Sequence, residues 1–355
     1  MKAMVLEQKG VLSIREVDAP VPFGDDPVLV RVGAVGVCGS DIVRYAKGKV
    51  YLLPLVLGHE FSAIVEQAPA GSRLVKGSRV VVYPLLPDPE DPFSQVGAFN
   101  VSSGYDYFGS RRDGAFEEFL YVPQKNLIPL PDGIPLIHAA MTEPSAVSLH
   151  GVLKFRIPPH ATALVIGCGP IGALAAQWLR VLGASKVIVA DVDEKKCAVM
   201  ERLGFTAINA SEKDTVSAVR EMTGGRGVDC AVEASGIART FVQAIEAAGV
   251  FGQVLFLGDV NSEVRLEDSL ISSVLRRELT LYGTWNSRNL PAGKSEWDMV
   301  LAQMGKGLQV GPLISHTPSL EEGPQIFADM ASRSIWYNKV VFPIAREARE
   351  EAAAL

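Results

Sequence analysis

Residues 163–172 read ALVIGCGPIG, an apolar run that leads directly into a Gly-x-Gly-x-x-Gly turn. The run predicts a buried β-strand, and the apolar spacing after the turn predicts a helix. In this context Gly167 permits a tight turn, Gly169 lets the backbone approach a pyrophosphate, and Gly172 lets the helix pack on the strand. The free N–H groups at the start of the helix attract phosphates. The dinucleotide contacts predicted from this segment are Gly167, Gly169, Pro170, Ile171 and Gly172.

The next apolar strand, Lys186–Ala190, ends immediately before Asp191. An acidic residue at this point can accept hydrogen bonds from both ribose hydroxyls of the cofactor and repels a 2′-phosphate. The sequence therefore predicts NAD as the cofactor rather than NADP. Lys195 and Lys196 follow nearby, so some tolerance of NADP remains open.

Strands and helices continue to alternate beyond this unit, which is typical of βαβ units and a parallel sheet. The other predicted elements are the strands Val228–Val232, Gln253–Leu257 and Leu279–Tyr282 and the helices Glu194–Leu203 and Arg239–Ala248. We expect an α/β protein with a Rossmann-type, doubly wound parallel sheet over 151–289. Short β segments punctuated by Gly, Pro and Asp predict a barrel-like second domain, formed by 1–150 and 290–355.

Composition excludes several classes of protein. The 355 residues carry a net charge of −6 and no run of basic residues, which argues against a nucleic-acid binder. No stretch approaches the roughly 20 apolar residues that span a bilayer, and the first ten residues lack the apolar core of a signal peptide. The four cysteines lie far apart, as expected in a reducing, cytoplasmic setting.

Four residues offer the ligands that zinc prefers. Cys38, His59, Glu60 and Glu143 supply a thiolate, an imidazole and two carboxylates. Three protein ligands with an exchangeable fourth position would describe a catalytic site rather than a structural one. Taken singly, Cys38 and His59 are more readily explained as core residues, and spacing alone does not connect positions 38, 59 and 143.

A resemblance connects them. The segments GVCGSD (36–41), GHE (58–60), DGAFEEFLYVP (113–123), TEP (142–144) and GCGPIG (167–172) resemble, in order and spacing, those of zinc-dependent medium-chain dehydrogenases, the alcohol and sorbitol dehydrogenase superfamily. The resemblance covers essentially residues 1–343. It implies a GroES-like catalytic domain, a Rossmann domain that binds NAD, and an active site in the cleft between them.

Within that superfamily, PLLP (84–87), YDYFGSRRDG (105–114) and GTW (283–285) resemble the galactitol-1-phosphate 5-dehydrogenases. This resemblance implies oxidation of a sugar alcohol or polyol phosphate by NAD⁺. Another secondary alcohol, such as a cyclitol, a free polyol or a small diol, remains an alternative. A non-catalytic nucleotide-binding protein is a further one, although a decayed site would be expected to have lost at least one of its four candidate ligands.

The resemblance also implies roles for the site residues. Zinc would bind the substrate hydroxyl and lower its pKa. Cys38 and His59 are the firmest ligands, while Glu60 and Glu143 compete for the remaining position, and the other glutamate would act behind the ligands or as proton acceptor. Ser40 resembles the proton-relay hydroxyl of the family, or is a turn residue. Val43 stands where some alcohol dehydrogenases have a relay histidine.

A phosphorylated substrate would need local positive charge, for which Arg44 and Arg111 are the candidates, each with surface exposure as the alternative. Trp285 could line the substrate pocket or be a buried core aromatic. The paired strands Gln253–Leu257 and Leu279–Tyr282 could extend the sheet across a two-fold axis, which predicts a homodimer or homotetramer.

One departure from the family concerns a second, structural zinc. Most relatives hold it with four cysteines spaced C-x2-C-x2-C-x7-C, and the corresponding positions here are Asp88, Asp91, Ser94 and Ser102. Two carboxylates and two hydroxyls make a poor tetrahedral zinc site, so we predict that this lobe folds without structural zinc. A hard cation such as Ca²⁺ at Asp88, Glu90 and Asp91 is less favoured than a solvated acidic loop.

Overall fold

The computed structural model describes residues 1–260, 262–290 and 295–354. The chain divides into two compact units. The first comprises Met1–Glu143, Arg288–Ala302 and Ile314–Leu355, and the second comprises Pro144–Ser287 and Gln303–Leu313. No helix in the described ranges is long and apolar enough to cross a membrane.

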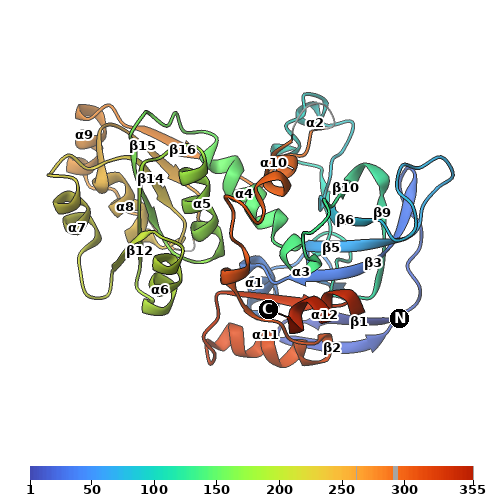
Figure 1. Cartoon of the computed structure of the whole chain (residues 1–355). Helices are drawn as coiled ribbons and strands as arrows, with labels where there is room; N and C mark the ends of the chain where they lie inside the picture. Colours follow the sequence, from blue (N-terminus) through green and yellow to red (C-terminus); the bar gives the residue numbers. More distant parts are fainter. Residues whose placement is uncertain (261, 291–294, 355) are drawn as a thin grey trace. The chain divides into compact units, whose positions relative to one another are not determined.

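The second unit contains a parallel sheet of six strands, as far as the structure describes it, in the order β13-β12-β11-β14-β15-β16 (Figure 1). Chain order reverses on either side of β11, which pairs with β12 through Ala163 and Val187 and with β14 through Ala163 and Cys230. The strands are β11 (Thr162–Ile166), β12 (Lys186–Asp191), β13 (Thr206–Asn209), β14 (Val228–Glu233), β15 (Ala248–Phe256) and β16 (Thr280–Gly283). This is the doubly wound sheet that the sequence predicts.

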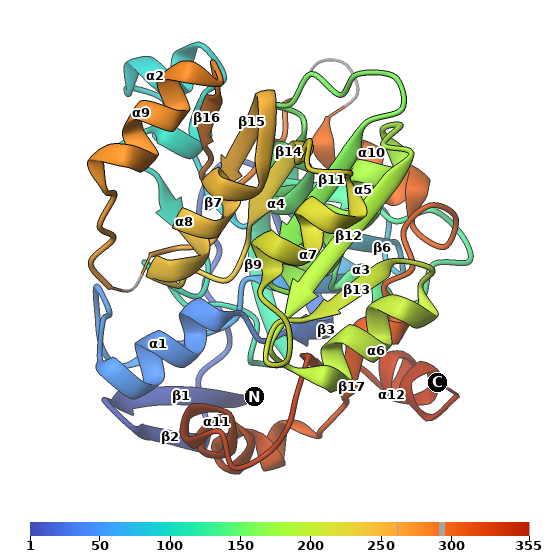
Figure 2. The same ribbon diagram turned by 90° about the vertical axis from the view of Figure 1, so that its left-hand side faces the viewer.

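Helices cover both faces of this sheet. Figure 1 shows α5 and α6 on one side of the strands and α7, α8 and α9 on the other, and Figure 2 shows the same sheet with α7 and α8 toward the viewer. Asp193 and Asp214 cap the first turns of α6 and α7 through their carboxylates. The helices are α5 (Pro170–Val181), α6 (Glu194–Arg202), α7 (Thr215–Met222), α8 (Ala238–Ala247) and α9 (Asp268–Arg276).

The glycine turn between β11 and α5 has the steric demands that the sequence indicates. Gly167 has a φ of 101°, which side chains rarely allow. A Cβ at Gly172 would lie 1.8 Å from the carbonyl oxygen of Gly167. Any larger residue at position 172 would therefore push α5 away from the strand.

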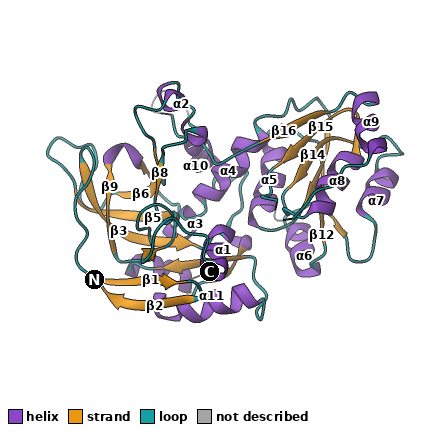
Figure 3. Ribbon diagram, turned by 180° about the vertical axis from the view of Figure 1, so that it is seen from behind, coloured by secondary structure: helices purple, strands orange, loops and turns teal. Residues whose placement is uncertain are grey.

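The first unit is built around a mainly antiparallel seven-stranded sheet, again within the described residues. Its order is β10-β6-β5-β3-β18-β17, with β9 paired to β3. A smaller sheet, β2-β1-β4, packs with helix α11 beside it (Figure 3). The larger-sheet strands are β3 (Pro27–Gly36), β5 (Glu60–Gln67), β6 (Arg79–Val82), β9 (Phe119–Pro123), β10 (Leu127–Pro129), β17 (Ile314–His316) and β18 (Lys339–Pro343). The smaller sheet contains β1 (Lys2–Gln8), β2 (Val11–Glu16) and β4 (Leu55–Val56).

The helices of the first unit are short. They are α1 (Gly39–Lys47), α2 (Pro92–Gln95), α3 (Leu136–Ala139), α10 (Glu296–Gln303), α11 (Gly323–Ser332) and α12 (Arg346–Ala353), and α4 (Thr142–Val152) crosses the boundary between the units. The core beneath them is rich in Val, Leu and Phe, with Phe116, Phe327 and Phe342 packed edge to face.

The segment after Pro343, which composition suggests is a polar tail, is the helix α12. Arg31 makes a two-pronged ion pair with Glu347 at 2.8 and 3.0 Å. Glu351 pairs with Arg79 at 2.9 Å and accepts a hydrogen bond from the Leu136 amide, at the start of α3. Ion pairs with the sheet therefore hold α12 in place, together with its buried Ala348.

The proline-rich segment 84–104 has little regular structure, as its sequence indicates. It contains β7 (Leu85–Leu86), the one-turn helix α2 and a 3₁₀ turn, and β7 pairs with β8 (Asp106–Tyr107). Asp91 caps α2 through Phe93 at 2.8 Å and accepts from the amide and hydroxyl of Ser103, both at 3.1 Å. A single carboxylate therefore joins the start of α2 to Ser103, near the end of the lobe.

Candidate functional site

Cys38 is positioned by the transition from β3 to α1. It is the N-cap residue of α1, and its Sγ accepts a hydrogen bond from the amide of Ser40 at 3.5 Å. The carboxylate of Asp41 accepts from the Cys38 amide at 3.0 Å, which completes a capping box. The cap fixes the thiol at the N-terminus of α1, where the amide dipoles favour a negatively charged ligand atom.

His59 and Glu60 stand at the start of β5, beside the end of β3. The β3–β5 register pairs Gly36 with Glu60. A Cβ at Gly36 would lie 2.4 Å from the Glu60 carboxylate and 3.0 Å from Cε of Lys339. Glycine at position 36 therefore makes room for the Glu60 side chain next to the Cys38 turn.

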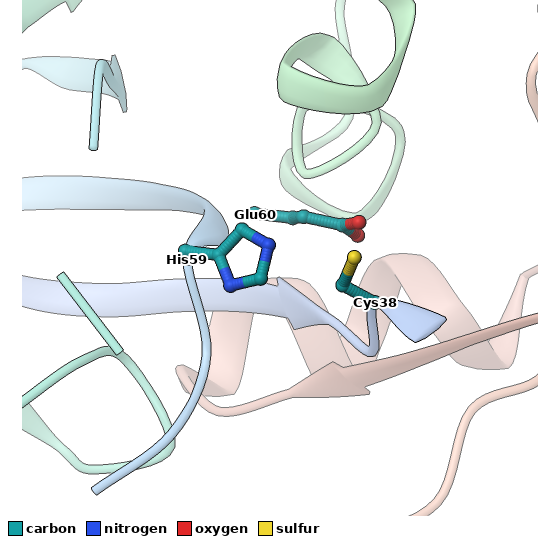
Figure 4. Close-up of side chains that lie close together, drawn as sticks. All are labelled: Cys38, His59 and Glu60. Atoms are coloured by element: carbon teal, nitrogen blue, oxygen red, sulfur yellow. The ribbon is translucent and has the colours of Figure 1, made fainter. Parts of the chain in front are cut away.

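Three side chains converge at this point (Figure 4). Potential ligand atoms of Cys38, His59 and Glu60 all lie within 4.8 Å of one another. His59 and Glu60 are buried, at 4% and 2% exposure. The Nδ1 atom of His59 is buried without a hydrogen-bond partner among the described residues. A thiolate, an imidazole and a carboxylate in such a group fit a tetrahedral zinc ion with a fourth position left open.

A fully buried carboxylate supports the imidazole. Asp41 lies 3.5 Å from Nδ1 of His59 and 3.0 Å from the guanidinium of Arg44. Burial alone would raise the pKa of Asp41, but His59, Arg44 and the Cys38 amide hold that pKa below its usual value. Burial would likewise lower the pKa of His59, yet the negative charge of Asp41 and Cys38 raises it well above normal. The negative charge of Asp41 and Cys38 around the imidazole therefore favours a positive charge at this point, either a proton on His59 or a metal ion beside it.

Glu60 has a partner from the far end of the chain. Lys339, on β18, forms a buried ion pair with Oε2 of Glu60, and both side chains are no more than 3% exposed. The Lys339 ammonium also donates to the carbonyl oxygen of Val37 at 2.9 Å. Oε1 of Glu60 takes no part in this ion pair, so a carboxylate oxygen remains for a metal.

Glu143 lies near this group without being one of its three members. It stands in the first turn of α4, and the Tyr107 hydroxyl donates to its Oε1 at 3.2 Å. The ring of Tyr107 also packs edge-on against the imidazole of His59, with 5.5 Å between the ring centroids. Burial raises the pKa of Glu143 to about 7, with the charge of Glu60 acting in the same direction and His59 and Lys339 opposing it. Glu143 can thus exchange a proton near neutral pH.

Ser40 and Arg44 are joined on the first turns of α1. Nη1 of Arg44 donates to Oγ of Ser40 at 2.8 Å and to Asp41 at 3.0 Å. Because the Ser40 oxygen accepts from Arg44, its own proton is free to point elsewhere. Nη1 of Arg44 thus holds the side chain on this turn. The other N–H groups of the guanidinium remain as possible donors to a phosphate.

The other two predicted substrate residues have different surroundings. The Arg111 guanidinium lies over the rings of Tyr51 and Tyr105, 4.8 and 4.4 Å from their centroids, and donates to the Tyr105 carbonyl. Trp285 is 55% exposed. The interpretation of Trp285 as a buried core aromatic is therefore wrong, because most of the ring is open to solvent.

The second unit holds the predicted dinucleotide residues. Gly169 is the N-cap of α5, and no side chain among the described residues caps this helix. A Cβ at Gly169 would meet nothing within 4 Å. Free amides and open space at a helix N-terminus fit a phosphate group. Asp191 accepts hydrogen bonds from the amides of Cys168 and Asp193 at 2.6 and 2.9 Å, so its carboxylate is fixed beside the turn.

Comparison with known proteins assigns the fold. Residues 24–132 match the alcohol dehydrogenase GroES-like domain, and residues 170–305 match the zinc-binding dehydrogenase family. The galactitol 1-phosphate 5-dehydrogenase of Escherichia coli K12 is 31% identical over 341 residues, which cover 94% of this chain and 98% of the relative. The chain belongs to the zinc-binding alcohol dehydrogenase family.

Other proteins similar to this chain support the same family assignment. The D-xylulose reductase of Morganella morganii is 35% identical over 66% of this chain and 72% of its own length. The crystal structure of the E. coli galactitol-1-phosphate dehydrogenase superposes with a TM-score of 0.89 over 97% of this chain and all of that chain. A zinc-binding dehydrogenase from Sinorhizobium meliloti 1021, bound to NADP, has a TM-score of 0.88 at 31% identity over 96% of this chain and 98% of its own. The sequence-based predictions of family, dehydrogenase activity and fold class are thereby confirmed.

Sequence reasoning missed several residues of this site. It assigned no role to Asp41, although its position three residues after Cys38 is the one expected of a capping carboxylate. Tyr107 and Lys339 carry no local signal, because only the tertiary fold brings 107, 143 and 339 together. The second role of Arg44, as a donor to Ser40 and Asp41, was also missed, although a spacing of three and four residues on one helix could have indicated it.

Proposed function

We propose that this family member is a zinc- and NAD-dependent dehydrogenase that oxidises a secondary hydroxyl of a sugar alcohol or polyol phosphate to a ketone. The observation that carries this proposal is the convergence of Cys38, His59 and Glu60 within 4.8 Å. The names of the relatives, a galactitol 1-phosphate 5-dehydrogenase and a D-xylulose reductase among them, support a polyol substrate. The balanced reaction is secondary alcohol plus NAD⁺ to ketone, NADH and a proton.

Cys38, His59 and Glu60 would hold the metal, with Asp41 orienting the imidazole of His59. The chemistry supplied by the bound groups is polarisation of the substrate hydroxyl by zinc and hydride acceptance by NAD⁺. Asp41 would favour the tautomer with the proton on Nδ1, because its carboxylate lies 3.5 Å from that atom. In this proposal Lys339 balances the charge of Glu60 and keeps its carboxylate directed toward Cys38.

Two groups of the chain would handle the proton. The hydroxyl of Ser40 accepts from Arg44, so its own proton can be passed on when it receives one from the substrate. Glu143 shares a hydrogen bond with Tyr107, and its pKa of about 7 suits a proton acceptor at neutral pH. The relay histidine found in some relatives is replaced by Val43, so Glu143 is the alternative exit.

The first unit, which overlaps most of the predicted 1–150 and 290–355, would be the catalytic domain. The second unit, which covers most of the predicted 151–289 and adds Gln303–Leu313, would be the NAD-binding domain. The uncapped start of α5 and the fixed Asp191 carboxylate support NAD as the preferred cofactor. One relative of known structure is bound to NADP, so the activity of this protein must be measured with both NAD⁺ and NADP⁺.

Two further parts of the proposal concern assembly and the lobe. Strand β16 lies at the edge of the parallel sheet, and apolar side chains are exposed near that edge, namely Phe251, Leu275 and Leu281. A homodimer, or a tetramer of such dimers, would cover them. In the lobe, the hydrogen bonds of Asp91 support folding without structural zinc.

The test is NADH formation with galactitol 1-phosphate and free galactitol offered side by side. Turnover of the phosphate ester alone supports a polyol phosphate dehydrogenase, and Arg111→Met should then raise KM for the ester. Turnover of free galactitol alone assigns a free polyol. Failure of both, together with turnover of a cyclitol or small diol, replaces the sugar alcohol by another secondary alcohol. A zinc-free protein without turnover on any secondary alcohol contradicts the enzyme assignment.

A further inference from the structure

A cavity lies in the first unit, apart from the metal-ligand candidates. Its volume is about 450 Å³, within the range of small-molecule sites. The N-terminal segment, the 54–56 stretch and the 108–121 stretch line it, and Cys38, His59 and Glu60 are not among its lining residues. Its walls are mostly apolar, and include Val5, Val17, Phe23, Leu55, Phe108 and Leu120.

One ionisable side chain of this cavity is buried without a partner. Glu117 lines the cavity and is only 4% exposed. Its backbone is fixed by a bridge to Ala3 of β1. No hydrogen bond or ion pair to its carboxyl group is found in the described part of the chain. Burial raises the pKa of Glu117 to about 9, with Asp113 acting in the same direction and the N-terminal ammonium opposing it.

Besides Glu117, the described lining residues of the cavity carry two carboxylates and two cationic groups. Asp18 and Asp113 also line it, and Asp113 accepts a hydrogen bond from the Val56 amide at 2.8 Å. The two cationic groups are already engaged elsewhere. The Arg112 guanidinium pairs with Asp106 at 2.7 Å and lies 3.7 Å over the Phe23 ring.

The N-terminal ammonium is the second of these cations. It donates to the carbonyl of Val17 at 2.9 Å and lies 3.4 Å from Glu16. Tyr121 contributes a neutral hydroxyl to the lining. The group that Glu117 lacks is therefore a cation inside the cavity, and none of the residues that the structure describes supplies it.

We propose that this cavity binds a small organic cation, an ammonium group on an apolar body, with Glu117 as its counter-ion. Buried carboxylates are ordinarily paired, because an isolated buried charge is costly. The apolar walls would take the body of the ligand. A hard metal ion does not fit, since it needs six or more oxygen ligands. Because burial raises the pKa of Glu117 to about 9, an ammonium that pairs with its carboxylate displaces a proton to the solvent.

The experiment is titration calorimetry of the whole, zinc-loaded protein without NAD. The probes are cyclohexylmethylammonium and its neutral isostere, cyclohexylmethanol. We expect the ammonium to bind about tenfold or more tightly than the alcohol, since a charged hydrogen bond is roughly twice as strong as a neutral one. The binding heat should vary with the ionisation enthalpy of the buffer, as release of the Glu117 proton requires.

Two variants locate the site. Glu117→Gln keeps the size of the side chain and should reduce ammonium affinity to that of the alcohol. Cys38→Ser serves as the matched control, because an amine bound to the catalytic metal would be lost in it, whereas an amine in the cavity would be kept. Alcohol binding by Glu117→Gln shows that the cavity is intact.

Equal affinity for the two probes overturns the proposal, as does full ammonium binding by Glu117→Gln. Loss of ammonium binding in Cys38→Ser assigns the amine to the metal centre and also overturns it. Failure of the ammonium to bind at all also overturns the proposal. If Glu117→Gln does not fold, buffer-independent binding heat of the wild-type protein is sufficient to reject the proposal.

Discussion

Replacing Lys339 by methionine should destabilise the metal-free protein far more than the zinc-loaded one. Lys339 is 3% exposed and pairs with Glu60, which is 2% exposed. The substitution keeps the length and apolar stem of the side chain but removes the ammonium. In the metal-free protein it leaves the Glu60 carboxylate buried without its cation and the Val37 carbonyl without a donor.

The magnitude follows from the burial of this pair. Removing one partner of a buried ion pair costs about 3–5 kcal/mol. Zinc at the same carboxylate would replace much of the lost positive charge, so the zinc-loaded variant should lose less. By linkage, any difference between the two losses appears as tighter zinc binding by the variant, and about 1.4 kcal/mol corresponds to tenfold. We therefore expect Lys339→Met to bind zinc about tenfold more tightly than the wild-type protein.

The assay is denaturant unfolding of both proteins, with chelator and with saturating zinc. Lys2→Met is the matched control, because Lys2 pairs with Glu321 at the surface, where the two side chains are 48% and 55% exposed. Such pairs contribute roughly 0–1 kcal/mol. Equal losses for Lys339→Met in the two forms would refute the placement of Glu60 beside the metal. A loss as small as that of Lys2→Met would refute the buried pair itself.

Three further predictions concern the cofactor, the lobe and the C-terminal helix. Asp191→Ala should raise KM for NAD⁺ relative to NADP⁺ by about tenfold or more, because it removes the ribose acceptor and the repulsion of a 2′-phosphate; an unchanged ratio contradicts this role. Asp91→Asn should lower Tm more than Asp88→Asn does, and equally with and without chelator; equal effects of the two variants would reject Asp91 as the lobe's cross-link. Arg31 lowers the pKa of Glu347 from 4.5 to about 2. The ion pair should therefore contribute its full stabilisation of the folded protein above pH 4.5 and lose it as the pH falls toward 2. Arg31→Met should lack this part of the decrease in unfolding free energy at acid pH. The same decrease in the variant as in the wild-type protein would contradict the role of the pair.

The parallel sheet is the part of the fold that the sequence predicts best, because each βαβ unit is local and its apolar strands are continuous. The residue bounds of β12, α6 and α8 were predicted to within one residue. The elements β13, α7 and α9 were missed, since each is short and an isolated helix of eight or nine residues is marginal without tertiary packing. Helix α12 was missed because its stability comes from ion pairs with residues far away in the sequence.

The candidate site shows a different limit. Ligand chemistry selected Cys38, His59, Glu60 and Glu143, and only the β3–β5 register brings the first three together. The choice between the two glutamates also depends on the tertiary fold. Glu60 lies with Cys38 and His59, whereas Glu143 accepts a hydrogen bond from Tyr107. Lys339, more than 200 residues away in sequence, could not be linked to Glu60 by any local pattern.

The most direct test of the central claim is the zinc content of the purified protein and of Cys38→Ser, measured together with NAD⁺-dependent oxidation of a polyol. The account predicts one zinc ion per chain in the wild-type protein, and loss of both zinc and turnover in the variant. Zinc and turnover that persist in Cys38→Ser would contradict the metal centre at Cys38, His59 and Glu60.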